Sequence, residues 1–361
     1  MSLRVALRHR FPGFDLDVDF ETPTGVTALY GRSGSGKTTI VNAVAGLLRP
    51  DAGTIVVDGV TMTDTGTGLF LPPHKRRIGY VFQEGRLFPH MSVRSNLTYG
   101  ARFAGHRDEA EFDRIVDLLG IADLLDRRPS KLSGGEKSRV ALGSDILSKP
   151  RLLLLDKPLA ALHEARKAEI LPYFERLRDE TGLPILYVSH SPSEVARLAT
   201  TVVLIDGGHV AAIGEAAEVF SDPAAAHALG LREAGAVLTA RIEAQEEDGL
   251  TRLSTSAGPL LLPSVNGSVG AMVRVRLLAQ DVMLATERPT GISALNVLPA
   301  RVREIREGEG PGALVQLEAG EEIILARITR RSAAALELAP GREVHAVLKA
   351  VSIAKESVGE I

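Results

Sequence analysis

The sequence contains no cysteine among its 361 residues, so it can form neither a disulfide bond nor a thiolate metal site. It also lacks an excess of positive charge, because 42 Lys and Arg residues stand against 45 Asp and Glu residues, for a formal net charge of −3. A protein that binds nucleic acid through its bulk charge would be strongly basic. We therefore expect no nucleic-acid partner, and the absence of cysteine is compatible with a reducing cytoplasm.

Long apolar runs are absent as well. No uncharged apolar run approaches the ~20 residues that a membrane-spanning helix requires. The first ten residues contain no apolar segment of the kind found in signal peptides. We expect a cytoplasmic protein that reaches a membrane only through a partner.

The order of the predicted elements indicates an α/β protein with a β-rich end. Residues 1–30 alternate apolar and polar side chains, which predicts an antiparallel β layer. Buried strands then alternate with helices as far as about residue 210, which predicts a parallel core sheet. Residues 72–77 read as a basic loop, and residues 107–128 as a small helical insert. After about residue 230 the chain consists mostly of short alternating β segments.

The chain is organised around one glycine-rich stretch, residues 31–38. Its members are Gly31, Arg32, Ser33, Gly34, Ser35, Gly36, Lys37 and Thr38, which fit the phosphate-loop pattern G-x-x-x-x-G-K-[ST]. A short strand precedes the stretch and a helix follows it, which places backbone N–H groups at the positive end of a helix dipole. In such a loop Lys37 bridges the β- and γ-phosphates, and the Thr38 hydroxyl holds Mg²⁺. We therefore predict ATP and Mg²⁺ as cofactors.

Two further stretches have chemistry that matches a nucleotide site. In Leu132-Ser133-Gly134-Gly135-Glu136-Lys137, Ser133 and Glu136 have capping-box spacing, and two glycines expose the backbone at a helix N-terminus. This stretch reads as a second anion cradle. Asp156 ends an all-leucine strand, residues 152–155, where a carboxylate is suited to bind Mg²⁺.

Taken together, these motifs resemble those of the ATP-binding cassette (ABC) ATPases, over about residues 1–230. The resemblance implies a P-loop NTPase cassette with a parallel core sheet, an antiparallel β layer and a helical subdomain. It also implies two ATP molecules held between the phosphate loop of one subunit and Ser133, Gly134 and Gly135 of the other, in a head-to-tail homodimer. Gln83 is expected to sense Mg²⁺ and the attacking water, with its loop on the membrane subunits, and His190 to contact the γ-phosphate. For adenine stacking the candidates are Phe11 and Phe14, with core packing as an equal alternative for each.

Several residues depart from the family pattern. Lys157 follows Asp156, where the family has the glutamate that polarises the attacking water, and His163 stands where it has an aspartate. Ser144 and Asp145 replace a common arginine–alanine pair. A charged ammonium cannot accept a proton from water, so we hypothesise that the chain binds ATP and hydrolyses it slowly or not at all.

Four stretches of the C-terminal part are distinctive: Ile292-Ser293-Ala294-Leu295-Asn296, the strand from Val297 to Ile305, Ala326-Arg327-Ile328-Thr329-Arg330-Arg331-Ser332 and Leu348-Lys349-Ala350-Val351-Ser352-Ile353. They resemble the Mop (molybdate-binding-protein-like) domain, over about residues 290–356. We predict an all-β, OB-like barrel here, preceded by a first β segment over residues 231–289. A weak internal repeat relates Gly270-x-x-Val273 to Gly341-x-x-Val344 and suggests two similar lobes. A tetrahedral oxyanion requires hydroxyl, backbone N–H and cationic donors, and the candidates are Ser293, Thr329, Ser332 and Lys349. A plain dimerising barrel with surface serines is the alternative.

These resemblances imply an ATPase subunit of a bacterial molybdate importer, at the cytoplasmic face of the inner membrane. The expected partners are a second copy of the chain, two membrane permease subunits and a periplasmic molybdate-binding protein, with molybdate or tungstate at the Mop domain. Two alternatives stay open. One is an importer of sulfate or another oxyanion, and the other is a non-hydrolysing regulator that binds ATP and an oxyanion.

Overall fold

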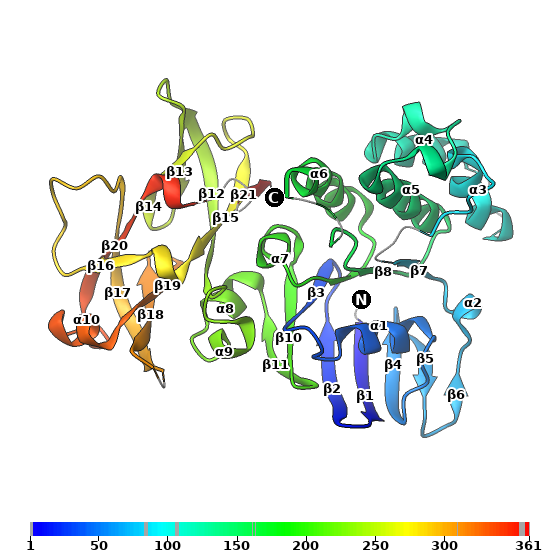
Figure 1. Ribbon diagram of the computed structural model, residues 1–361, viewed down its shortest axis with the longest axis horizontal. Helices are drawn as coiled ribbons and strands as arrows, with labels where there is room; N and C mark the ends of the chain where they lie inside the picture. The colour runs from blue at the N-terminus through cyan, green and yellow to red at the C-terminus, as the bar shows by residue number, and fades with distance from the viewer. Residues whose placement is uncertain are drawn as a thin grey trace. The chain divides into compact units, whose positions relative to one another are not determined.

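The computed structural model describes residues 3–82, 86–104, 108–160, 162, 164–308, 310–353 and 358–360 (Figure 1). The chain divides into two compact units, one made of Met1–His190 with Leu198–Ile213, the other of Ser191–Arg197 with Gly214–Ile361. The domain limits expected from the sequence, at residues 230 and 290, remain predictions. Among the described residues, no helix has both the length and the apolar character to span a bilayer.

The first unit is built on a six-stranded sheet in the order β11-β10-β3-β9-β8-β7. The pairs β10–β3, β3–β9, β9–β8 and β8–β7 are parallel, as the alternation of strands and helices predicts. The four leucines of β8 are at most 1% exposed, in keeping with a strand that is covered on both faces. The strands are β3 (Val26–Tyr30), β7 (Ile78–Val81), β8 (Leu152–Asp156), β9 (Ile185–Val188), β10 (Thr201–Asp206) and β11 (His209–Gly214).

A second, antiparallel sheet has the order β2-β1-β4-β5-β6. The period-two pattern predicts its first two strands correctly, because Leu3, Val5 and Leu7 of β1 are buried while the residues between them are not. Residues 26–30 belong instead to the parallel sheet. The strands are β1 (Leu3–Phe11), β2 (Phe14–Thr22), β4 (Ala52–Val57), β5 (Val60–Asp64) and β6 (Leu69–Phe70).

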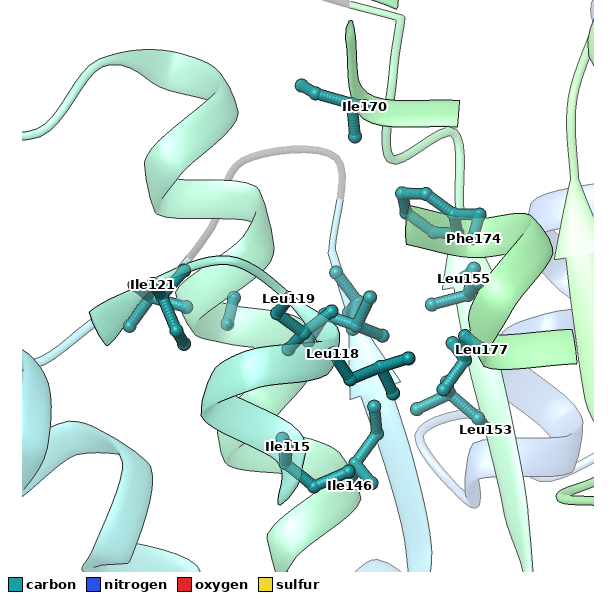
Figure 2. Close-up of a cluster of buried hydrophobic side chains, with 14 of the residues drawn as sticks. Ile115, Leu118, Leu119, Ile121, Ile146, Leu153, Leu155, Ile170, Phe174 and Leu177 are labelled. Carbon is teal, nitrogen blue, oxygen red and sulfur yellow. The ribbon is translucent and has the colours of Figure 1, made fainter. Parts of the chain in front are cut away.

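Helices of the first unit form a separate apolar core with the parallel sheet. Figure 2 shows side chains of α4, α5 and α6 meeting Leu153 and Leu155 of β8. The expected helical insert is present as α4 and η1, whereas α3 was not predicted. The helices are α1 (Lys37–Ala45), α2 (Pro73–Arg76), α3 (Val93–Ala104), α4 (Glu109–Leu118), η1 (Ala122–Leu124), η2 (Pro129–Lys131), α5 (Gly134–Leu147) and α6 (Glu164–Thr181), and α7 (Pro192–Leu198) follows β9.

The expected basic loop at residues 72–77 is wrong. Its centre is the helix α2, and the Arg76 side chain is fully buried. The guanidinium donates to the carbonyl oxygens of Leu71, Ala43 and Val44 and to the Thr63 hydroxyl, at 2.7–2.9 Å. Burial lowers the pKa of Arg76 to about 10. Because two of these acceptors end helix α1, Arg76 anchors the helix that carries the phosphate loop.

The second unit contains two five-stranded antiparallel sheets, ordered β14-β13-β12-β15-β21 and β16-β20-β17-β18-β19. One apolar core holds both sheets together. Its strands are β12 (Gly235–Gln245), β13 (Leu250–Thr255), β14 (Gly258–Pro263), β15 (Met272–Leu278), β16 (Met283–Ala285), β17 (Asn296–Glu307), β18 (Gly312–Ala319), β19 (Glu322–Thr329), β20 (Glu343–Leu348) and β21 (Val358–Glu360). Its helices are α8 (Ala216–Ser221), α9 (Ala226–Leu229), η3 (Ala279–Asp281), α10 (Arg330–Ala335) and η4 (Ala350–Ser352). The expected duplication of lobes is therefore confirmed.

Candidate nucleotide-binding site

The glycine loop joins β3 to α1, and the helix begins at Lys37 without a side-chain cap. The N–H groups of its first turn therefore point into the loop with no side chain bound to them. The Lys37 ammonium donates to the carbonyl oxygens of Gly31 and Arg32, each at 2.7 Å, and to Ser35 Oγ at 3.1 Å. These three bonds fold the loop around the lysine and form a compact ring of N–H donors, as anion binding requires.

Two of the loop glycines are required by their neighbours. At Gly31, where φ is +143°, a Cβ would lie 2.1 Å from the carbonyl oxygen of Ile205 in β10. At Gly36, where φ is +102°, a Cβ would lie 2.7 Å from Leu16 Cδ1. Any side chain at either position would push the loop away from the sheets that support it.

A cavity of about 530 Å³ opens beside this loop. Its walls contain most of the residues that the sequence predicts for the site. They are Ser33, Gly34, Ser35, Gly36, Lys37, Thr38, Thr39, Lys157, His190, Phe11 and Phe14. Phe11 is 38% exposed and Phe14 is partly buried against the core, so both rings are available for stacking, and the two remain open as candidates. The volume and the donors match a phosphorylated ligand with a planar base.

Asp156 lies at the end of β8, next to this cavity. One carboxylate oxygen, Oδ2, lies 3.5 Å from the Tyr80 hydroxyl. Burial raises the pKa of this carboxyl, while Lys157 and the nearby Thr38 hydroxyl favour its charged form. The other oxygen, Oδ1, is buried without a hydrogen-bond partner. A buried, unpartnered carboxylate oxygen beside a threonine hydroxyl fits Mg²⁺, which is held by hard oxygen ligands.

Tyr80 is a residue of this site that sequence reasoning missed. Its hydroxyl also donates to Asn42 Oδ1 at 3.2 Å, so it connects Asp156 to helix α1. Burial, followed by the Asp156 charge, raises the pKa of Tyr80 well above its ordinary value. The only signal in the sequence is the hydroxyl group of Tyr80 within an otherwise apolar strand. That signal does not indicate which residue the hydroxyl contacts.

The predicted second cradle is a capped helix terminus. Ser133 Oγ accepts from the Glu136 N–H at 3.3 Å, and Glu136 Oε2 accepts from the Ser133 N–H at 2.6 Å, which completes the capping box. Ser133 and Gly134 are exposed. A Cβ at Gly135 would lie 2.6 Å from Ile170 Cδ1, so this glycine serves the packing of α5 on α6. These residues do not line the phosphate-loop cavity of the same copy.

Comparisons with known proteins agree with this geometry. The ABC transporter family matches residues 16–160, and the TOBE domain matches residues 292–354. A molybdenum import ATP-binding protein ModC of Mesorhizobium japonicum is 52% identical over 361 residues, covering 99% of this chain and 98% of the relative. A protein of the same name from Paramagnetospirillum magneticum is 48% identical and covers 99% of each chain. The chain belongs to the ModC family of ABC transporter ATP-binding proteins.

Solved structures support the cassette fold of this ModC-family chain. The structure of cbiO1 from Clostridium perfringens, described as part of the ABC transporter complex cbiONQ, matches with a TM-score of 0.54 and 27% identity. The match covers 64% of this chain and 94% of that one. An ATP-binding cassette of another ABC transporter, at 24% identity and the same TM-score, shows the fold alone. The α/β cassette followed by a β-rich, OB-like domain is thus confirmed.

Lys157 faces the same cavity as Lys37 in this ModC-family chain. Its backbone is left-handed, with φ at +50°, a conformation that costs a non-glycine residue about 1 kcal/mol. Burial, and then the charge of Lys157, lower the pKa of Lys37 to about 8, while Asp156 raises it. The two ammonium groups are therefore close enough to repel each other across the nucleotide site. Gln83 and His163 lie outside the described residues.

Asp145 of α5 lines a cavity of about 260 Å³, whose walls also contain residues of α3 and β7. Tyr80 and Phe82 stack in its wall with ring centroids 4.0 Å apart, and the Arg86 guanidinium lies 4.1 Å from the Phe82 ring centroid. Burial raises the pKa of Asp145 to about 7, although a hydrogen bond from the Tyr80 backbone N–H lowers it. The carboxyl group is thus held in conditions that favour its neutral form.

Replacing Asp145 by asparagine is expected to stabilise the protein at high pH only. The folded state holds this proton up to about pH 7 and the unfolded state only to about pH 4, so native stability falls as the pH rises between these values and then stays lowered. Removal of the charge should therefore raise the unfolding free energy at pH 8 by up to about 4 kcal/mol, and leave it unchanged at pH 4. Urea titrations at both pH values measure this. Asp126→Asn, at an exposed position, is the control, and an equal effect of Asp145→Asn at both pH values would contradict the expectation.

The oxyanion candidates of the barrel fall into two groups. Ser293 and Lys349 lie at the same end of the β17–β20 pair, in which Asn296 stands opposite Leu348, and both are exposed. Thr329 instead caps α10 by accepting from the Ser332 N–H, and the hydroxyls of these two residues are 2.8 Å apart. Asn296, by contrast, is 1% exposed and both accepts from and donates to the backbone of Leu261, so its function is structural. Among the described residues, no cluster of three or more His, Asp or Glu side chains could hold a metal ion.

Proposed function

We propose that this chain is the ATP-hydrolysing, energy-coupling subunit of a molybdate importer. The observation that carries this proposal is the 52% identity, over nearly the whole of both chains, to a protein named for molybdenum import and ATP binding. The sulfate alternative has no comparable support, since several further relatives at 47–52% identity bear the same name. The phosphate-loop cavity supplies the nucleotide site that the proposal requires.

In this function the loop from Gly31 to Thr38 holds the triphosphate. Its N–H groups and the Lys37 ammonium bind the phosphate oxygens, and Lys37 gives up its bonds to the loop carbonyls as it turns toward them. Thr38, Asp156 and Gln83 would hold Mg²⁺, which would neutralise the charge that develops on the transferred phosphoryl group. Asp156 Oδ1, which is buried and has no hydrogen-bond partner, would be one of the ligands of this ion. His190, in the cavity wall, contacts the γ-phosphate.

The reaction requires a second copy of the chain. Ser133, Gly134 and Gly135 do not line the phosphate-loop cavity of their own copy, while Ser133 and Gly134 are exposed at the start of a 14-residue helix. We place them on the γ-phosphate held by the opposite subunit, where the helix dipole favours negative charge. Two ATP molecules are then bound at one head-to-tail dimer interface. Binding closes the dimer, and hydrolysis with product release opens it.

Lys157 makes the hydrolytic step slow. The position next to Asp156 requires a group that accepts a proton from the attacking water, and a charged ammonium cannot do so. Lys157 instead adds a cation to the phosphate site. The chain therefore binds ATP and hydrolyses it slowly.

Coupling to transport requires further partners. Two permease subunits form the translocation path, a periplasmic protein delivers molybdate, and the cassette sits at the cytoplasmic face of the inner membrane. The loop of Gln83 transmits nucleotide state to the permeases. Ser293 and Lys349 mark an oxyanion site on the barrel, through which molybdate or tungstate slows transport when supply is ample.

Uptake by proteoliposomes tests this function. Vesicles that contain the chain, its permeases and its binding protein should accumulate radiolabelled molybdate only when ATP is inside, and a tenfold excess of sulfate should leave the rate unchanged. ATP-dependent uptake of sulfate in place of molybdate would favour the competing importer. ATP binding without any ATP-dependent uptake would favour the non-hydrolysing regulator.

A further inference from the structure

The two sheets of the second unit repeat one pattern, and each exchanges its last strand with the other. The orders β14-β13-β12-β15 and β19-β18-β17-β20 correspond strand for strand. A 3₁₀ helix follows the fourth strand of each, η3 after β15 and η4 after β20. The strand that leaves η3, β16, pairs with β20 of the other sheet, and the strand that leaves η4, β21, pairs with β15. We call residues 233–281, which contain β12–β15 and η3, the first lobe, and residues 293–352, which contain β17–β20 and η4, the second lobe.

Backbone hydrogen bonds fix the correspondence to single residues. Ile242 donates its N–H to Ala271 at 2.9 Å and accepts from the Gly270 N–H at 2.8 Å. Val302 donates to Arg342 at 2.9 Å and accepts from the Gly341 N–H at 2.7 Å. The ladder between the first and second strands shifts register immediately after each of these residues. Ile242 and Val302 are therefore equivalent.

This equivalence pairs the oxyanion candidates of the second lobe with very different residues in the first. Ser293 lies nine residues before Val302, and Glu233 lies nine before Ile242. Lys349 is the residue just before η4, and its counterpart Leu278 is the residue just before η3. The first lobe thus has a carboxylate and an apolar side chain where the second has a hydroxyl and an ammonium.

The carboxylate of Glu233 is bound within its own lobe. Arg276 of β15 forms an ion pair with it at 3.0 Å and donates to the Glu233 carbonyl oxygen at 2.8 Å. The Arg276 side chain is only 7% exposed, whereas that of Glu233 is 42% exposed. A guanidinium buried to this extent requires an anionic partner, and the partner here lies on the solvent side of the pair.

At the same end of the first lobe, helix α9 packs against the residues that flank β12 and β15. Ala226 of α9 packs with Ala234 and Ala279 in a small buried cluster, which Leu314 of β18 and Leu325 of β19 complete. The equivalent end of the second lobe instead leaves Leu295 and Val351 exposed, at 53% and 79%. The alanines equivalent to Ala234 and Ala279, Ala294 and Ala350, are buried as well, so the two lobes differ in the apolar side chains that the second lobe exposes next to them.

We propose that Glu233 is a built-in ligand of the first lobe. Its carboxylate takes the place that an oxyanion takes in the second lobe, with Arg276 as its cation. The barrel then binds one oxyanion per chain rather than two, and Arg276 of the first lobe keeps the same anionic partner whatever the oxyanion supply. The inference rests on the oxyanion binding proposed above, because it assigns that binding to one lobe only.

Equilibrium dialysis of the full-length chain against molybdate tests this assignment. The wild type should bind one molybdate per chain, and Lys349→Leu, which installs the first-lobe residue, should bind none. Glu233→Ser should gain a second equivalent, since Arg276 then recruits an anion from solution, and Glu233→Ser combined with Arg276→Met should return to one. Glu243→Ser removes the same charge from an exposed position of β12 and should stay at one. Thermal melts and ATP binding are measured on the same samples.

The outcomes separate this inference from the function on which it rests. Two molybdate ions on the wild type, or a Glu233→Ser variant that melts normally and still binds one, would overturn the built-in ligand. A wild type that binds ATP but no molybdate would overturn it as well, while leaving the nucleotide-driven function intact. A chain that binds neither would overturn both.

Discussion

Lys157→Glu is expected to raise the steady-state rate of ATP hydrolysis by about 100-fold, the lower end of what a positioned general base contributes. Lys157 lines the phosphate-loop cavity and follows Asp156 directly, so a carboxylate at this position would be next to the predicted Mg²⁺ site. The variant also removes the charge that lowers the pKa of Lys37. Phosphate release by the full-length chain, at saturating ATP and Mg²⁺, measures the effect.

A matched variant separates the effect of gaining a general base from the effect of losing the positive charge of Lys157. Lys157→Gln removes the ammonium without supplying a proton acceptor, so its turnover should remain near the wild-type value. If glutamine raised turnover as much as glutamate, repulsion between Lys157 and Lys37 would be the cause of slow hydrolysis. Unchanged turnover in Lys157→Glu would refute the proposal that Lys157 limits the reaction.

Lys37→Ala is expected to weaken ATP binding by roughly 100-fold or more. The ammonium makes charge-assisted hydrogen bonds, each of which contributes about 1.5–3 kcal/mol, and loss of two of them corresponds to at least about 3 kcal/mol. The same group also folds the loop through Gly31, Arg32 and Ser35. Titration with a fluorescent ATP analogue gives the dissociation constant.

Lys75→Ala provides the control, because it removes an equal charge from an exposed position of α2. Its affinity for the analogue should match the wild type. Thermal melts establish that both variants fold. A folded Lys37→Ala chain with unchanged affinity would contradict the assignment of the phosphate loop.

The sequence predicts the local geometry of the candidate nucleotide site well where that geometry depends on neighbouring residues. The loop from Gly31 to Thr38 and the capping box at Ser133 are set by neighbouring residues, so spacing alone indicates their geometry. Asp156 was also placed correctly, because an all-leucine strand that ends in a carboxylate is a strong pattern. The parallel pairing of the core strands was predicted from the alternation of strands with helices, whereas their order in the sheet was not.

Contacts between distant residues could not be predicted in the same way. Arg76 was expected in a basic loop, yet it binds four acceptors that lie up to 33 positions away. The contact between the Tyr80 hydroxyl and Asp156 exists only because β7 pairs with β8. The pairing of Glu233 with Arg276 depends on the register of β12 against β15, which no local pattern encodes. Gly135 was expected to expose its backbone. Its close contact with Ile170 could not be predicted, because it depends on how α5 packs against α6.

Disulfide trapping between two copies measures most directly whether the nucleotide is held at a shared interface. The chain has no cysteine, so a Ser33→Cys copy mixed with a Ser133→Cys copy contains only the two thiols of interest. Mild oxidation should give a covalent dimer in high yield with ATP and Mg²⁺ and little without them, while Ser268→Cys, at an exposed turn of the barrel, should not join to Ser33→Cys. A yield that is independent of ATP, or equal for the two pairings, would contradict a nucleotide clasped between two subunits.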